Sequence, residues 1–238
     1  MEILQKILLL LLTATLSFCA PLKDPPVNNT DLITELRNVP TAADRTLLLA
    51  KQGNQSFIFD FNNPPSQAIK TNSGGKFVSA NIRTFPALTG AAIAMNVGTV
   101  APCGVVATHI HPRADEFVIV VQGRLIAQAI TEGGSVLITN ELPAFTVTLF
   151  NQGAFHAQHN PDCTEAKFIA SFNNNDPGVT VIVPNFMLFN DDVVLGGMGV
   201  GVGADISQGE LESIRGHMPL GNFAVQSCLE KCGLKGNR

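Results

Sequence analysis

Four of the chain's five histidines fall between positions 109 and 159. His109 and His111 are separated by one residue, so their side chains would point to the same face of a strand. Glu116 follows a Pro-Arg pair that can turn the chain, and it begins the apolar run EFVIVVQ. His156 lies on a later run, from which it could complete the cluster across a barrel. Three imidazoles and one carboxylate suit a divalent transition metal such as manganese, iron, zinc, nickel or copper, and an octahedral ion would keep open positions there.

The elements that must position these residues are mostly strands. From Ser56 onward, short runs of β-branched, aromatic and small apolar residues recur between Gly, Pro and Asn breaks. This spacing is typical of an all-β sandwich or barrel and not of alternating βα units. The runs are SFIFDF, KFVSANIRTF, AAIAMNV, EFVIVVQ, RLIAQAI, SVLIT, FTVTLF, AKFIASF and VTVIV. The apolar residues within them are expected to line the barrel, including Phe117, Phe145, Phe150 and Phe155.

The two ends of the chain differ from this strand-rich middle. Residues 20–55 are predicted to form an extended arm with a short helix in the amphipathic stretch from Asp31 to Lys51. After Val183, helix-like spacing predicts helices within 185–195, 207–217 and 221–232. The glycine-rich piece LGGMGVGVG has no Lys and no strand leading into it, so it is interpreted as a connector and not as a phosphate loop. Residues 56–238 are therefore expected to form one domain with a helical C-terminal segment.

Length and composition fit one well-packed domain. The chain has 238 residues, of which 45% are hydrophobic and 14% charged, so it can bury a substantial core. The formal net charge is -4, and the sequence contains no cluster of Lys and Arg. A nucleic-acid partner therefore lacks an electrostatic basis. A small molecule, a metal ion or another protein is the expected partner.

The first residues, MEILQKILLLLLTATLSFCA, have the pattern of a secretory signal peptide. The apolar run is too short to span a bilayer, and small residues favour cleavage after Cys19. Residues 1–19 are thus expected to be removed, which predicts a secreted protein of the extracellular space or cell wall. Two sequons, at Asn28 and Asn54, are compatible with glycosylation on that route.

Four cysteines remain after removal of the signal peptide: Cys103, Cys163, Cys228 and Cys232. An even number in a secreted chain favours disulfides over free thiols. Cys103 with Cys163 is the preferred pair. Cys228 and Cys232 are four residues apart, near the upper limit for a bridge on a regular helix, so whether they are bridged stays open.

Two segments together resemble the germins and germin-like proteins of the cupin superfamily, in particular the spherulin-like members. The first cupin motif, G-x5-H-x-H-x3,4-E-x6-G, is similar to CGVVATHIHPRADEFVIVVQG, and the second, G-x5-P-x-G-x2-H-x3-N, to FTVTLFNQGAFHAQHN. The resemblance spans about residues 57 to 200. It implies a jelly-roll β-barrel with C-terminal α-helices, subunits assembled through those helices as trimers or hexamers, and one manganese ion on His109, His111, Glu116 and His156.

Three residues with ligand-type side chains, Asp115, His159 and His217, are not expected to bind the metal ion. Asp115 is an alternative to Glu116, but the six residues between Glu116 and the motif glycine favour Glu116. His159 lies three residues after His156, so strand alternation turns it to the opposite face, and a surface or hydrogen-bonded histidine is expected. His217 is interpreted as an ordinary residue on a helix face. The chain departs from the motifs at Cys103, Phe145 and Asn151, which replace two glycines and a proline, so turn geometry is affected and no ligand is.

Germins that oxidise oxalate resemble one another in two asparagines, three and thirteen residues before the first ligand histidine. Here these positions are Val106 and Asn96, so Asn96 is a candidate substrate-binding residue and oxalate oxidation is disfavoured. The resemblance implies a manganese-dependent oxidoreductase, such as a superoxide dismutase. A non-enzymatic cell-wall, spore, encystment or storage protein is the alternative, and an isomerase or binding cupin with another metal is weaker.

Overall fold

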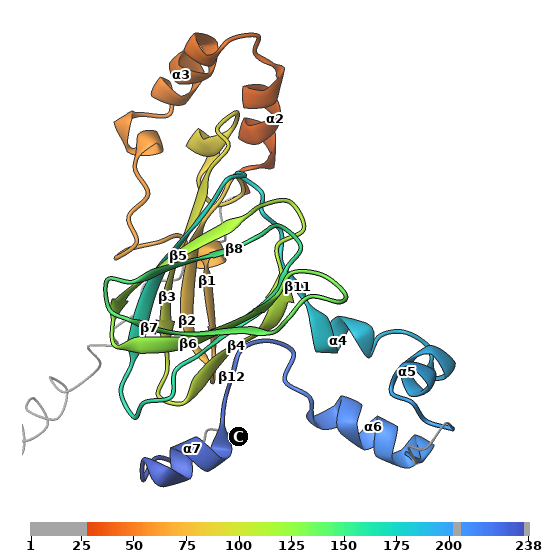
Figure 1. Cartoon of the computed structure of the whole chain (residues 1–238). Coiled ribbons are helices and arrows are strands. Elements are labelled where there is room, and N and C mark those ends of the chain that lie inside the picture. Colours follow the sequence, from red (N-terminus) through yellow and green to blue (C-terminus); the bar gives the residue numbers. More distant parts are fainter. Residues whose placement is uncertain (1–27, 202–205, 236–238) are drawn as a thin grey trace, which may run out of the picture.

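The computed structural model describes residues 28–201 and 206–235, so the predicted signal peptide lies outside the described residues. Two antiparallel sheets face each other and form the barrel in Figure 1. In order across the first sheet lie β1 (Ile69–Asn72), β2 (Gly75–Ala80), β3 (Ala94–Val100), β10 (Ala166–Phe172), β5 (Glu116–Gln122) and β8 (Val147–Phe150). Across the second lie β11 (Thr180–Val181), β4 (Gly104–Ile110), β9 (Phe155–His159), β6 (Arg124–Ile130) and β7 (Ile138–Pro143), and β12 (Phe223–Ala224) also pairs with β4.

Alternation along the strands builds the core between the sheets. Strand β10 buries every second residue, from Ala166 to Phe172, and β5 does the same from Glu116 to Val120. The apolar core therefore comes from the inward faces of both sheets, as expected for strands whose side chains alternate. The all-β barrel and the C-terminal helices predicted from the sequence are confirmed. None of the described helices is both long and apolar enough to cross a membrane.

The strand predictions held best where an apolar run alternates cleanly. Strands β5, β6 and β10 have the predicted bounds. The run SFIFDF is not a strand: its start lies in the 3-10 helix η1 (Asn54–Phe57), and two further 3-10 helices are η2 (Ser66–Ala68) and η3 (Pro86–Leu88). Strand β1, with the sequence IKTN, was missed because three of its four residues are exposed and polar.

The N-terminal extension contains two helices instead of one. Helix α2 (Thr30–Asn38) ends just before Pro40, which is consistent with the steric restriction that proline imposes on the preceding residue. Helix α3 (Ala42–Ala50) starts at a capping box in which Thr41 and Asp44 bond each other's backbone N–H groups. Both helices lie above one end of the barrel in Figure 1.

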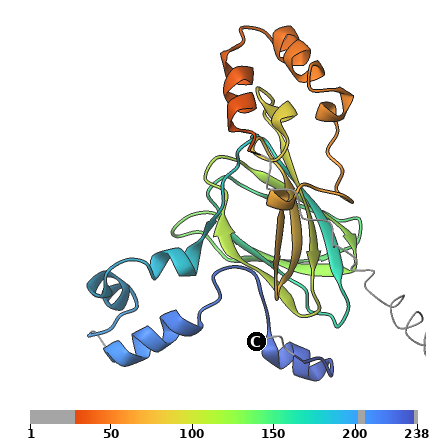
Figure 2. The same ribbon diagram turned by 180° about the vertical axis from the view of Figure 1, so that it is seen from behind.

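The C-terminal helices project from the barrel, as Figures 1 and 2 show from opposite sides. They are α4 (Ile182–Phe186), α5 (Asp191–Gly197), α6 (Gln208–His217) and α7 (Gln226–Lys231). Met187, Val194 and Leu211 form a small buried cluster of their own between α4, α5 and α6. The predicted helix at 221–232 begins instead as β12, so residues 218–225 form a strap that returns from α6 to the edge of β4.

Three of the four phenylalanines expected to line the barrel point outward, so this part of the prediction is wrong. Phe117, Phe145 and Phe155 are 53%, 81% and 46% exposed, whereas Phe150 is buried. Phe117 and Phe155 occupy the outward positions of their strands, and the inward neighbours in each are a metal-motif residue, Glu116 or His156. Alternation therefore assigns the inner face to the polar residues.

The turns at which the chain departs from the cupin motifs keep their geometry. Cys103 and Phe145 have φ of 57° and 64°, and they are the non-glycine residues with positive φ in the described part of the chain. This left-handed conformation is the one that glycine adopts without cost. At the third departure, Ala154 N–H donates to the Asn151 carbonyl across a turn that has Gly153 at positive φ. The motif glycines are replaced, but the turns they would form are present.

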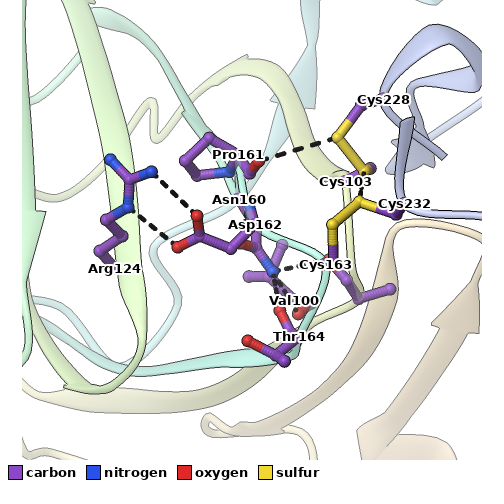
Figure 3. Close-up of a disulfide and its surroundings, with 11 residues drawn as sticks. Val100, Cys103, Arg124, Asn160, Pro161, Asp162, Cys163, Thr164, Cys228 and Cys232 are labelled. Carbon is purple, nitrogen blue, oxygen red and sulfur yellow. Dashed lines mark hydrogen bonds and ion pairs between the residues drawn. A yellow bond between two sulfur atoms is a disulfide. The ribbon is translucent and has the colours of Figure 1, made fainter. Parts of the chain in front are cut away.

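The predicted disulfide between Cys103 and Cys163 is wrong. Cys103 is bonded to Cys228, and Cys163 to Cys232, so both cysteines of the α7 region are bridged, though not to each other (Figure 3). Cys103 and Cys163 do lie in neighbouring backbone, because Cys103 N–H donates to the carbonyl of Asp162 at 3.1 Å. The α7 segment docks against this pair and takes both as partners, which could not be inferred from the spacing of the cysteines.

The loop that carries Cys163 is held in place by polar side chains (Figure 3). Arg124 on β6 binds both carboxylate oxygens of Asp162 at 2.9 Å. The amide of the fully buried Asn160 donates to the carbonyls of Ala101 and Thr164. Asn160, the last residue of the second cupin motif, therefore fixes the loop between β9 and β10 and joins it to the turn between β3 and β4.

Candidate metal centre

Strands β4 and β9 bring two of the histidines face to face. His109 lies directly opposite His156, and Val106 lies opposite Gln158. Three residue steps along β4 therefore correspond to two steps along β9. The extra residue forms a β-bulge, a device that re-aims side chains within an antiparallel pair. The bulge lets Val106 and His109, three positions apart, both point to the barrel interior.

Each histidine of the group is oriented by a backbone carbonyl. The Nδ1 atoms of His109 and His156 lie 2.7 and 2.8 Å from the carbonyls of Ala107 and Ala154, and Nδ1 of His111 bonds the carbonyl of Gly178. A proton on Nδ1 satisfies each of these bonds. It leaves Nε2 as the nitrogen that each ring presents to the group, which is the atom a metal ligand offers.

The Nε2 atoms converge on one carboxylate. Oε2 of Glu116 lies 2.8 Å from Nε2 of His156 and 3.2 Å from Nε2 of His111. Candidate donor atoms of the four residues lie within 4.8 Å of one another, and all four side chains are buried. Ligand atoms around a single ion with bonds of about 2.1 Å at right angles are roughly 3 Å apart, which matches these contacts.

The electrostatics keep the group ready for a cation. Burial, and next the neighbouring His156, lower the pKa of His109 to about 4, so its imidazole is neutral at neutral pH. Burial also acts on Glu116, where it is the largest single influence and favours the protonated acid. The contacts of the carboxylate with His111 and His156 together outweigh it and lower the pKa of Glu116, so the carboxylate stays ionised. A neutral imidazole on His109 and an anionic carboxylate on Glu116 are the protonation states in which these two residues bind a metal ion.

Aromatic rings shield two of the imidazoles from solvent. Phe150 stacks on His156 with ring centroids 4.3 Å apart, and Phe172 meets His111 edge to face at 4.6 Å. Both phenylalanines are buried. A buried set of three imidazoles and one carboxylate with fixed rings could hold a transition-metal ion, so the donor chemistry fits such a group.

A cavity of about 790 Å³ opens onto the group. His109, His111 and Glu116 line it, and so do Asn96 and Val106, the two positions at which the sequence was compared with oxalate-oxidising germins. The structure therefore brings Asn96 to the same cavity as the candidate ligands. Val106 presents only methyl groups there.

Gln158 is a cavity residue that the sequence analysis did not single out. It is 1% exposed, and neither its Nε2 nor its Oε1 has a hydrogen-bond partner among the described residues. Its position two residues after His156 is the signal that could have revealed it, because strand alternation turns both residues inward. A buried amide with no partner is costly, so this side chain is poised to bond a ligand.

The other candidates lie elsewhere. Asp115 is occupied by two hydrogen bonds, from Gln152 N–H and from the Asn173 amide, so it does not compete with Glu116. His159 is half-buried on the opposite face of β9, and its Nε2 has no partner in the described chain, so the expected hydrogen bond is not seen for that atom. His217 is exposed on α6, as predicted, and bonds the Ser213 carbonyl of its own helix.

Comparison with known proteins agrees with this geometry. The family model described as Cupin matches residues 59–194. Spherulin-1A of Physarum polycephalum is 37% identical over 205 residues, which cover 85% of this chain and 79% of that protein. Germin-like protein subfamily 2 member 3 of Arabidopsis thaliana is 28% identical over 153 residues, or 63% of this chain and 67% of that protein.

Solved structures support the fold. Oxalate oxidase in complex with the substrate analogue glycolate matches with a TM-score of 0.61 and 22% identity over 71% of this chain and 83% of its own. Oxalate decarboxylase of Bacillus subtilis, described with Mn(II) centres, matches at 0.57 and 16% identity over 67% of this chain and 40% of its own.

Two antiparallel sheets around a buried group of three histidines and one glutamate define a jelly-roll β-barrel with a candidate metal centre inside. The chain belongs to the cupin family, among its spherulin-like and germin-like members.

Proposed function

We propose that this protein is a secreted cupin that holds one manganese ion on His109, His111, Glu116 and His156 and acts as an oxidoreductase of the superoxide dismutase type. The single observation that carries the proposal is the convergence of four buried donor atoms at the end of an open cavity. Manganese is favoured by the mixed nitrogen and oxygen ligand set and by its occurrence in oxalate decarboxylase, which shares the fold.

The chain's own residues would bind the metal ion, orient its histidine ligands and shield them from water. The backbone carbonyls of Ala107 and Ala154 fix the rings of His109 and His156 with Nε2 inward, and Phe150 excludes water behind them. When bound, the ion would supply one-electron redox chemistry. Superoxide is small and reaches the centre through the cavity, so dismutation needs no further side chain to bind it.

Oxalate oxidation stays disfavoured. An oxalate dianion needs polar donors beside the metal, and Val106 offers none to it. Asn96, together with the unpartnered Gln158, lines the cavity and could donate to a different ligand. We expect oxalate turnover to be weak or absent in the unmodified protein.

Secretion is part of the proposal. Two disulfides support an oxidising compartment, because such bonds persist there and are rare in the cytosol. Asn28 and Asn54 are both exposed, so glycosylation at these sequons would meet no steric obstacle. The signal peptide itself is predicted from the sequence alone.

Metal analysis of the purified protein by mass spectrometry, alongside a superoxide assay, tests the proposal. We expect about one manganese per chain and measurable dismutation. His111→Ala should lose both while the protein stays folded, because it removes one of four ligands. His217→Ala is the matched control, since that histidine is exposed on α6, and it should change neither.

Two results would contradict the proposal in different ways. Stoichiometric metal in His111→Ala would refute the ligand set. Full metal content without dismutation would instead favour the non-enzymatic cell-wall, spore, encystment or storage protein, in which a metal only stabilises the barrel.

A further inference from the structure

The cavity is much larger than a metal centre alone requires. About 790 Å³ is the size of a pocket for a drug-sized molecule, whereas superoxide and oxalate have two and six heavy atoms. Strand register divides its wall into levels. Glu116 lies opposite Phe172, Asn96 opposite Ala170, and Gly98 opposite Phe168, so each level is two residues further along β10. Two residues of a strand span about 7 Å, which puts Phe168 about 13 Å along the strand from the level of Glu116.

The middle level is polar. We call Ser79, Asn96 and Gln158 the polar layer: Ser79 and Asn96 are cross-strand neighbours, and all three line the cavity. Ser79 and Asn96 are half-buried, and Gln158 is fully buried, with no hydrogen-bond partner for either amide atom among the residues that the structure describes. A buried amide without a partner is unfavourable, so a ligand oxygen that accepts a hydrogen bond from it would increase the affinity for that ligand.

The outer level is aromatic. Phe77 and Phe168, the aromatic layer, flank Gly98 on neighbouring strands with ring centroids 6.3 Å apart. A Cβ on Gly98 would lie 2.4 Å from the Phe168 ring, so glycine lets that ring lie flat across β3. These rings line the cavity and give it an apolar surface beyond the polar layer.

The charges of the lining favour an anion. Besides histidines, the ionisable residues among the described lining are Glu116 and Lys70. Lys70 lies opposite Phe77 in the β1–β2 pair, so it shares the cavity face, and it forms no ion pair with another described residue. The positive charges of a divalent ion at Glu116 and of the Lys70 ammonium would together exceed the single negative charge of the Glu116 carboxylate. The cavity would therefore attract anions.

We propose that the cavity binds an amphipathic organic acid. Its carboxylate lies at the metal level, an oxygen substituent near the acid group bonds Gln158 in the polar layer, and its apolar end packs on Phe77 and Phe168. This ligand goes beyond dismutation, and the proposal rests on the proposed function only for the metal ion that anchors the carboxylate. Oxalate would occupy the first level and leave the other two unfilled.

Calorimetric titration of the metal-loaded protein tests the assignment, with 3-hydroxyoctanoate, octanoate and oxalate as probes. We expect 3-hydroxyoctanoate to bind once per chain and at least tenfold more tightly than oxalate. Gln158→Leu should weaken 3-hydroxyoctanoate by about tenfold, the value of one hydrogen bond, and leave octanoate unchanged. Phe77→Ala should weaken both eight-carbon acids.

Gln128→Leu is the matched control, because that glutamine is exposed on the outside of β6, and it should alter no titration. Metal content is measured on every sample. Oxalate binding as tight as 3-hydroxyoctanoate, or equal loss of both eight-carbon acids in Gln158→Leu, would overturn the inference with the metal still bound. If the protein takes up no metal but binds 3-hydroxyoctanoate, and Gln158→Leu weakens that binding, the acid site would be supported and the proposed function contradicted.

Discussion

Phe145 combines two unfavourable features at one position: a left-handed backbone with φ of 64° and a side chain that is 81% exposed. A non-glycine residue in this conformation costs about 1 to 2 kcal/mol, and glycine avoids that cost at the expense of a more flexible unfolded chain. We expect Phe145→Gly to raise the free energy of unfolding by about 0.5 to 1 kcal/mol, measured by denaturant titration. Phe145→Ala removes the ring but keeps the strained backbone, so it should not stabilise. Equal stabilisation by both variants would attribute the effect to the ring.

The buried His109 gives the metal-free protein a defined pH dependence. Its pKa is about 4 in the folded state and 6.5 ordinarily, so between these values the unfolded chain takes up a proton that the folded chain does not. Stability should therefore fall as pH falls from 6.5 to 4, by at most about 3.5 kcal/mol at 1.4 kcal/mol per pH unit. The lowered pKa of Glu116 acts in the same direction below its ordinary value of 4.5. Unfolding of EDTA-treated protein at several pH values measures this, and His109→Gln should flatten the slope. A stability that rises on acidification would contradict the protonation states assigned to the group.

At the scale of elements, the C-terminal strap completes the bulge that positions the first candidate ligand. Oδ1 of Asn222 accepts from the N–H of Ala107 at 2.9 Å, and the carbonyl of Ala107 bonds Nδ1 of His109. Ala107 is the kind of bulge residue whose N–H the strand ladder leaves unpaired. The strap is thus coupled to the orientation of His109 through one backbone unit.

Asn222→Ala should therefore lower the free energy of unfolding by about 1 to 3 kcal/mol, because it leaves the buried N–H of Ala107 without an acceptor. It should also weaken metal retention against a chelator. Asn222→Asp keeps an acceptor oxygen and should retain most of both properties. Asn63→Ala, at an exposed loop position, is the control. If Asn222→Ala loses stability but keeps the wild-type rate of metal loss, the strap stabilises the fold without affecting the orientation of His109.

For the whole molecule, we propose self-association through the outer face of the first sheet. Phe117 lies opposite Leu149, and the two are 53% and 54% exposed beside Val147 at 47%. Contiguous exposed apolar residues on a sheet face are unusual in monomers. We expect light scattering to report an oligomer, which the family resemblance suggests is a trimer or hexamer. Phe117→Glu should dissociate it, whereas Leu47→Glu on the distant α3 should not. A monomer at all concentrations would rule out this surface as an interface.

The sequence predicted the features that depend on the two-residue period of a strand. It did not predict the features that depend on contacts between distant segments. The two-residue period of His109, His111 and their strand correctly indicated a shared face, and the alternation of EFVIVVQ fixed β5 to the residue. The pairing of Cys103 could not be read from spacing, because it depends on where α7 docks. Gln158 was missed although alternation puts it beside His156, since a glutamine in an apolar run resembles any solvated residue until its surroundings are known. Phe117 and Phe155 were assigned inward by their hydrophobicity, yet their neighbours Glu116 and His156 take the inner face.

The two disulfides impose an order on how the protein is made. A ribosome delivers Cys103 and Cys163 well before Cys228 and Cys232, and the backbone of Cys103 reaches the Asp162 carbonyl next to Cys163. An early bond between the first two cysteines is then the accessible one. Attack on it by the Cys228 thiolate would form the Cys103–Cys228 bond and release the Cys163 thiolate, and an oxidant of the secretory route would then join Cys163 to Cys232. Sγ of Cys103 lies 3.7 Å from Sγ of Cys232 in the finished fold, so the four sulfur atoms of the two mature bonds lie in one cluster. We expect thiol trapping and peptide mapping during synthesis to find the Cys103–Cys163 bond first and the mature pairs later. If Cys103 and Cys163 both stay reduced in nascent chains until release, the barrel would instead form without a disulfide, and both bonds would form only after the C-terminal segment is made.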